Sequence, residues 1–353
     1  MKRHGELWAR LTSFENLYRA ACKAARGKRR RPNVARFHFQ LERQLLRLQA
    51  ELLNNTYVPG TYREFEIHEP KRRLISAAPY RDRVVHHALC NVLEPIFERV
   101  FIHDSYACRA SKGTHAALDR FTYFARRYRY VLKCDVSKFF PSIDHGILKE
   151  LIARKVKDRA VHWLAAVIID HANPQEPVGE WFADDDLLPP LERRRGLPIG
   201  NQTSQFFANV YLNPLDHFVK ECLGVYGFCR YCDDFVLFSN DKDFLHDARD
   251  ACRVFLEKLR LRLHPHKSVI YRTADGPRFL GFRVFPEQRR LARENVVRMR
   301  CRLLRLQHQY AKGRITQEAV QRRIQSWIGH ARHGDTWRLR ERLFSEVVFT
   351  RAP

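Results

Sequence analysis

The stretch Phe228-Cys229-Arg230-Tyr231-Cys232-Asp233-Asp234-Phe235-Val236-Leu237-Phe238 sets two adjacent carboxylates between two apolar runs. The pattern predicts two strands joined by a tight turn at the acidic pair. Adjacent carboxylates repel each other in a tight turn, so the position favours a bound cation. Mg²⁺ takes oxygen ligands from a few carboxylates and fills its remaining positions with substrate phosphates. The alternative for an isolated Asp pair is a solvated turn.

Six other segments carry short motifs in a fixed order around this hairpin. They are EPKRRLIS at 69–76, YACRASKG at 106–113, KCDVSKFFPSID at 133–144, RGLPIGNQTSQ at 195–205, LHPHKS at 263–268 and FLGF at 279–282. Together with Y-x-D-D at 231–234, they resemble the motifs of the reverse transcriptases. The first two are similar to fingers motifs, the next two to motifs A and B, and the last two to motifs D and E. The resemblance covers roughly residues 60 to 285.

One departure narrows the resemblance. Most bacterial reverse transcriptases carry Q-G-x-x-x-S-P in motif B, whereas here Ile199 precedes Gly200 and Gln205 ends the motif. This I-G-x-x-x-S-Q form, with SWIGHA at 326–331, resembles the reverse transcriptases of diversity-generating retroelements. The resemblance implies an enzyme that copies a template RNA into cDNA and miscopies its adenines.

The charge of the chain points to a polyanionic partner. The 353 residues include 64 Lys and Arg against 39 Asp and Glu, a net charge of +25. Nucleic acid is therefore the leading partner, ahead of a membrane surface. No run of 18 apolar residues occurs, and the charged N-terminus lacks the apolar stretch of a signal peptide. Nine scattered cysteines, an odd number, favour reduced thiols and a cytoplasmic location, and the Cys229/Cys232 spacing is attributed to strand packing.

The predicted fold class is α+β, a right-hand polymerase with fingers, a ferredoxin-like palm and a helical thumb. Helical patterns dominate residues 1–59, including a basic loop at 26–32 that either grips phosphates or is a solvated turn. The fingers are assigned to 60–130 and the palm to 131–288, with a fingers insertion at about 155–195. Three consecutive Asp at 184–186 are expected in a solvated loop. Residues 289–353 are basic and helical, and are assigned to the thumb.

The palm is where the sequence brings distant carboxylates together. A strand at 130–135, helices, the 228–238 hairpin, a helix at about 244–261 and a strand at 269–271 follow the ferredoxin-like order. In that order the first strand lies beside the hairpin, which places Asp135 next to Asp233 and Asp234. Two Mg²⁺ ions held by these residues would clamp the attacking and leaving oxygens of nucleotidyl transfer. The resemblance adds the backbone carbonyl of Val136 as a further ligand.

The resemblance also assigns residues to the nucleotide. Lys71 and Arg73 match fingers positions that hold the triphosphate, and Lys267 matches the motif D lysine that protonates pyrophosphate. Phe140 matches the aromatic ring that excludes a ribose 2′-hydroxyl, with a core position as the alternative. Ile199, Gly200 and Gln205 form the motif B contact with the incoming nucleotide. Because Ile199 offers shape where Gln offers hydrogen bonds, the sequence predicts loose control of pairing.

The partners implied are template RNA, the cDNA/RNA duplex, dNTPs and a small basic accessory protein from the same cassette, with oligomers a possible form and no membrane. Three alternatives remain open. A retron-like defence enzyme would carry the usual motif B. An RNA-binding intron maturase would carry a further C-terminal domain. A catalytically dead relic would have lost carboxylates that this chain keeps.

Overall fold

The computed structural model describes residues 3–68, 72–171, 181–182, 185 and 193–351. The chain begins with four helices, whose bounds are α1 Trp8–Thr12, α2 Phe14–Ala25, α3 Pro32–Phe39 and α4 Leu41–Leu53. Leu45, Leu48 and Leu52 of α4 are buried, as their helical spacing predicts. The basic stretch at 26–31 forms the predicted loop between α2 and α3.

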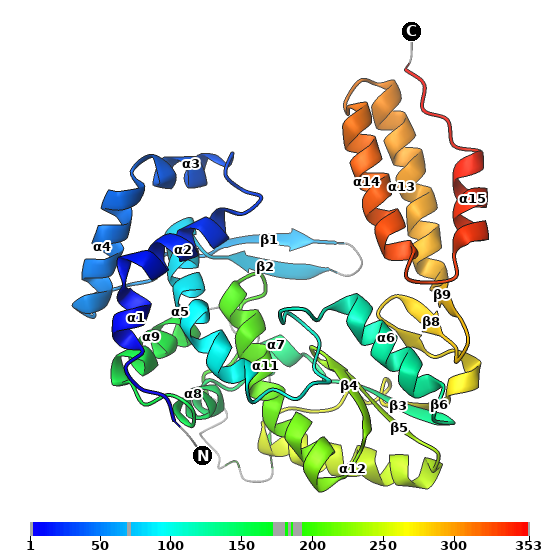
Figure 1. Cartoon of the computed structure of the whole chain (residues 1–353), viewed down its shortest axis with the longest axis horizontal. Coiled ribbons are helices and arrows are strands. Elements are labelled where there is room, and N and C mark those ends of the chain that lie inside the picture. Colours follow the sequence, from blue (N-terminus) through cyan, green and yellow to red (C-terminus); the bar gives the residue numbers. More distant parts are fainter. Residues whose placement is uncertain (1–2, 69–71, 172–180, 183–184, 186–192, 352–353) are drawn as a thin grey trace.

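A small antiparallel sheet follows the helices. Strands β1 Arg63–Ile67 and β2 Arg73–Ala77 pair with each other. The long helix α5 Tyr80–Glu98 packs against α2 and against α11 Gln202–His217. The β1–β2 sheet projects beside the N-terminal helices, toward the C-terminal helices (Figure 1).

The central sheet, called the palm sheet here, has four strands: β3 Tyr130–Asp135, β4 Gly227–Tyr231, β5 Asp234–Ser239 and β6 Val269–Arg272. Their spatial order is β4-β5-β3-β6, and each neighbouring pair is antiparallel. Helices α7 Phe139–Ser142, α8 His145–Ala153, α9 Arg159–Asp170 and α11 connect β3 to β4, and α12 Lys242–Lys258 connects β5 to β6. The predicted ferredoxin-like order is therefore confirmed.

Alternation along the strands separates the two faces of the palm sheet. Leu132, Cys134 and Leu237 point to the core built with α11 and α12. Val131 and Val236 point to a second core under α6 Thr114–Ala125. This second core is completed by a sheet of three short strands: β7 Arg278–Phe279, β8 Phe282–Val284 and β9 Arg289–Leu291.

Three helices end the chain: α13 Arg293–Ala311, α14 Gln317–Ala331 and α15 Trp337–Ser345. They form a bundle beyond the β7–β9 strands (Figure 1), and the base of the bundle joins the second core, where Ala331 of α14 is fully buried. Met299, Leu303 and Leu343 form its small core. The helices predicted after residue 289 are thus confirmed. No helix in the described ranges is long and apolar enough to cross a bilayer.

The prediction of a solvated acidic loop at 184–186 is wrong for the residue that can be judged. Asp184 and Asp186 lie outside the described residues, but the Asp185 side chain is buried. It pairs with Arg193, and Arg260 lies 3.0 Å away. Two guanidinium groups, Arg193 from the same insertion and Arg260 from beyond α12, supply the charge that lets this carboxylate leave water. All nine cysteines are free, and Cys229 packs inside the palm sheet.

Candidate active site

Three carboxylates meet at one end of the palm sheet. Asp135, the last residue of β3, is the direct cross-strand partner of Asp234, the first residue of β5. Cys232 has φ of +58°, which turns the chain sharply between β4 and β5. The Val136 N–H donates to the Asp233 carbonyl at 3.3 Å, which fixes the turn against the end of β3. Residues about a hundred positions apart are thereby brought together, as the sequence predicts.

The acids also share the face of the sheet that is only partly covered. Lys133 and Asp135 alternate with the buried Leu132 and Cys134, so they point to the same side as Val131. The α6 helix covers Val131 and leaves the acidic end half exposed. The site is therefore a ledge at the end of a buried sheet, open to a large substrate.

Burial and like charge act together on the acidic pair. The pKa of Asp233 is raised by burial and by the nearby charge of Asp135, while Arg73 acts in the opposite direction. The pKa of Asp234 is raised by burial and by both neighbouring carboxylates, against the lowering effect of Lys133. Such a cluster favours the arrival of a cation.

Two lysines neutralise part of this charge. Lys267 Nζ donates a hydrogen bond to Asp135 Oδ2, and Lys133 Nζ lies 3.6 Å from Asp234 Oδ1. The sequence assigns Lys267 to pyrophosphate, and the structure places it directly on the Asp135 carboxylate. Lys133 was not among the predicted site residues.

The carboxylate oxygens of the three Asp are suitable ligands for magnesium, although their side chains are not arranged around a common metal position. Among the described residues, no three His, Cys, Asp or Glu side chains are arranged to hold a metal ion. The three Asp nevertheless offer the oxygen-only chemistry that Mg²⁺ requires. Val136 forms an isolated antiparallel bridge with Leu263. In this bridge the Ser137 N–H donates to the Arg262 carbonyl and the His264 N–H donates to the Asp135 carbonyl. The bridge therefore does not engage the Val136 carbonyl.

The motif B loop is fastened to the β1–β2 sheet. The Ser76 N–H donates to the Ile199 carbonyl at 3.1 Å. The buried Asn201 side chain accepts from the Ala78 N–H at 3.1 Å and donates to the Ser76 carbonyl at 3.2 Å. Gly200 has φ of +121°, and a Cβ there would lie 2.9 Å from Ile75 Cγ2. Glycine is therefore required both by the backbone and by the close approach of β2.

The remaining predicted site residues fall around this loop. Ile199 and Phe140 are half-buried, and Gln205 is exposed in the first turn of α11. The Phe140 carbonyl accepts from the Leu197 N–H at 2.9 Å, which joins motif A to motif B. Arg73, exposed at the start of β2, is near enough to affect Asp233. Lys71 lies outside the described residues.

A buried ion pair behind the acidic turn was missed by the sequence analysis. Arg230 and Asp216 are both fully buried, with Nε–Oδ1 and Nη2–Oδ2 distances of 2.6 Å. Arg230 also donates to the Cys232 carbonyl at 3.0 Å, inside the turn that carries Asp233. Asn209 and Ser105 accept two further bonds from it, at 3.3 and 3.2 Å. This guanidinium therefore anchors the acidic turn to α11.

Only a weak signal in the sequence could have indicated that anchor. Arg230 is a lone charge inside an otherwise apolar strand, and such a residue requires a buried partner. Asp216 is the single acidic residue of α11, but nothing in the local pattern shows that this helix packs behind the strand of Arg230. Asn201 carried a comparable hint, as a polar residue beside a glycine at a helix start.

Comparison with known families accounts for this geometry. Residues 67–284 match the family described as "Reverse transcriptase (RNA-dependent DNA polymerase)", which is more than half of the chain. The chain belongs to the reverse transcriptase family. The predicted α+β right-hand polymerase fold is confirmed, and this reverse transcriptase is an RNA-directed DNA polymerase by class.

The relatives are diverse. The reverse transcriptase is 27% identical over 305 residues to protein YkfC of Escherichia coli (strain K12), covering 75% of this chain and 77% of YkfC. It is 26% identical to the group II intron-encoded protein LtrA of Lactococcus lactis subsp. cremoris, covering 51% of this chain but 29% of LtrA. It is 32% identical to nuclear intron maturase 1, mitochondrial, of Arabidopsis thaliana, over 26% of this chain and 13% of the maturase.

A solved structure also matches. It is the apo telomerase from Candida tropicalis truncated from its C-terminal domain, at 14% identity and a TM-score of 0.46, covering 66% of this chain and 55% of that chain.

Proposed function

We propose that this reverse transcriptase serves a diversity-generating retroelement, copying a template RNA into cDNA that is mutated at template adenines. The observation that carries the proposal is Ile199. Its backbone is bonded to β2, the strand that begins at Arg73, and its side chain is apolar where most bacterial relatives have Gln. A position that reads by apolar shape discriminates less than one that reads by hydrogen bonds.

In this proposal Asp135, Asp233, Asp234 and the Val136 carbonyl would hold two Mg²⁺ ions. The ions, when bound, would supply the Lewis acidity for the attack of the 3′-hydroxyl on the triphosphate. The cross-strand pairing of Asp135 with Asp234, at adjacent ends of β3 and β5, supports this assignment. Lys267, bonded to Asp135 in this structure, would give a proton to the departing pyrophosphate once the carboxylate binds metal.

The nucleotide is held from the β1–β2 side. Arg73 would contact the triphosphate, and Lys71 is assigned the same role from its motif. Phe140, whose side chain is partly buried against the core, would exclude the 2′-hydroxyl. Gly200 and Gln205 would line the same loop. Each of these roles follows from the motif positions, and for Arg73 its influence on the pKa of Asp233 adds proximity to the acidic ledge.

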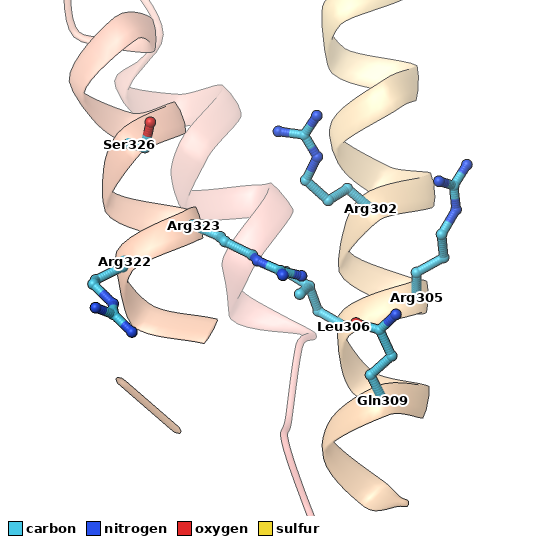
Figure 2. A pocket seen from close by; sticks show the side chains of 7 residues that line it. All are labelled: Arg302, Arg305, Leu306, Gln309, Arg322, Arg323 and Ser326. Atoms are coloured by element: carbon cyan, nitrogen blue, oxygen red, sulfur yellow. The ribbon is translucent and has the colours of Figure 1, made fainter. Parts of the chain in front are cut away.

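The C-terminal bundle supports a thumb along the template–primer duplex. A cavity of about 480 Å³ opens between α13 and α14, lined by Arg302, Arg305, Leu306, Gln309, Arg322, Arg323 and Ser326. Figure 2 shows the side chains of Arg302 and Arg323 directed into the space between the two helices. Arginine forks suit the phosphates of a duplex. The domain bounds 1–59, 60–130, 131–288 and 289–353, the accessory protein and the cytoplasmic location belong to the same proposal.

A second candidate is an enzyme that acts on a group II intron. It is favoured by relatives described as a group II intron-encoded protein and as an intron maturase. Such an enzyme would copy its RNA without a bias at adenine. The error spectrum therefore distinguishes the two.

The test is to sequence cDNA made on one defined RNA by the wild type and by Ile199→Gln. We expect wild-type errors concentrated opposite adenine, and a lower adenine error rate in the variant because Gln restores a polar contact. Ile199→Val, which keeps an apolar side chain, is the matched control and should keep the wild-type spectrum. Uniform wild-type errors across the four template bases would contradict the retroelement assignment.

A further inference from the structure

A second basic cavity lies far from the acids. It has a volume of about 700 Å³ and opens where α6 ends and β3 begins. Its lining residues are Ala125, Arg126, Arg127, Tyr128, Arg129, Tyr130, Asn240, Arg272, Thr273, Ala274 and Pro286. Four arginines line it and no acidic residue does. A concave surface of one charge sign concentrates the field and attracts opposite charge.

The cavity lies at the opposite end of the palm sheet from catalysis. Tyr130 begins β3 and Asp135 ends it, and Arg272 is the cross-strand partner of Tyr130. Five residue steps along a strand span about 17 Å. The cavity is separated from the ledge by the part of the sheet that α6 covers. Nucleic acid bound here would not be the nucleotides undergoing reaction.

Among the residues that the structure describes, the arginines of the cavity have no acidic partners. Within the described residues, none of Arg126, Arg127, Arg129 and Arg272 forms an ion pair with a carboxylate. Arg126 Nε donates to the Pro286 carbonyl at 2.8 Å, and the Arg127 guanidinium lies 4.1 Å from the centre of the Tyr123 ring. These contacts orient the groups without cancelling their charge. Four gathered cations repel one another, so an anion bound between them is stabilised.

The framework of the cavity is fixed before any ligand arrives. The Thr273 N–H donates to the Arg129 carbonyl at 2.9 Å, and its hydroxyl donates to the Tyr128 carbonyl at 2.7 Å. The Arg129 N–H donates to Asn240 Oδ1 at 3.0 Å. The loop that carries three of the arginines is thus bonded to the end of β6 and to the turn after β5. Binding requires little ordering of the backbone.

We propose that this cavity binds single-stranded RNA, in a segment of the template that lies outside the duplex being copied. The guanidinium forks match phosphate oxygens, and the half-buried rings of Tyr128 and Tyr130 offer surfaces for stacking a base. Aromatic rings among unpaired arginines favour RNA over an acidic protein. The proposal holds whichever RNA this reverse transcriptase copies.

The test compares Arg129→Ala/Arg272→Ala with the wild type on two probes. One is a short template–primer that fills only the catalytic ledge, and the other carries a single-stranded RNA extension of the template. On the extended probe we expect a higher Kd and a slope of log K against log salt that is smaller by about 1.4, since two phosphate contacts are removed. On the short probe kcat and KM should equal the wild-type values.

Two further variants separate the site from net charge. Arg253→Ala/Lys258→Ala removes the same charge from the exposed surface of α12 and should leave the extended probe unaffected. Arg129→Lys/Arg272→Lys should keep the salt dependence. Equal Tm values for all variants establish intact folding. Unchanged affinity of the alanine variant for the extended probe, or an equal loss in the α12 variant, would overturn the proposal. Normal RNA affinity combined with loss of a protein partner would assign the cavity to an acidic protein instead.

Discussion

Two ion pairs flank the same acidic turn and differ in their access to water. The Arg230–Asp216 pair has no exposed side-chain surface. The Lys267 and Asp135 side chains are 43% and 16% exposed. Breaking a fully buried pair leaves an uncompensated charge, which costs about 3–5 kcal/mol, whereas an exposed pair contributes about 0–1 kcal/mol. The buried Arg230–Asp216 pair therefore holds the base of the hairpin permanently. At the exposed end, Asp135 can exchange Lys267 for another cation.

The largest expected effect concerns the exchangeable end. Asp135→Asn or Asp233→Asn should reduce primer extension under Mg²⁺ to background, because a neutral amide cannot hold the metal pair. RNA affinity and Tm should stay close to the wild-type values, which shows that the loss is chemical. Full-length cDNA from either variant would remove these residues from the catalytic set.

The next effect concerns the buried Arg230–Asp216 pair. Arg230→Met should lower the free energy of unfolding by about 3–5 kcal/mol, since Asp216 is left buried without a counter-charge. Denaturant titration measures this loss. The double variant Arg230→Met/Asp216→Leu replaces both charges by apolar groups and should recover most of the stability. A single variant as stable as the wild type would mean that the pair is not the anchor described above.

The smallest effect separates neutralisation from proton transfer at Lys267. Lys267→Ala should lower kcat about 10²-fold, the range expected when a general acid is lost. Lys267→Arg keeps the charge beside Asp135 but holds its proton too tightly to donate it. We expect the Arg variant to remain as slow as the Ala variant in single-turnover extension. Recovery of the wild-type rate by Arg would reduce Lys267 to a counter-charge.

The comparison also explains which structural features could be predicted from the sequence. Strand 130–135 and the 228–238 hairpin have apolar runs long enough to identify, and their order predicts the meeting of Asp135 with Asp234. The partner of Arg230 could not be read, because it depends on how α11 packs behind the sheet. Strands β7 to β9 have two or three residues each, too few to show alternation.

The Asp185 prediction failed for a related reason. A run of acids in a polar segment indicates a solvated loop, but Arg193 of the same insertion and Arg260, from beyond α12, pair with Asp185 in the folded chain. The ledge itself was predicted well because strand register alone places Asp135 beside Asp234, whereas the Lys267 and Lys133 contacts depend on tertiary packing. Sequence patterns report local geometry, and buried charge pairing is decided by the assembled fold.

The bonds from β2 to Ile199 and Asn201 have a mechanical consequence. Three hydrogen bonds couple the strand that begins at Arg73 to the loop at the start of α11. A tilt of the β1–β2 sheet cannot occur without carrying this loop with it, so the two move as one lever. In the proposed function, closure of Arg73 on a triphosphate would bring the Ile199 loop toward the base by the same displacement. Binding the phosphates and inspecting the base would then be one motion, and a nucleotide held at one end would be sampled at the other.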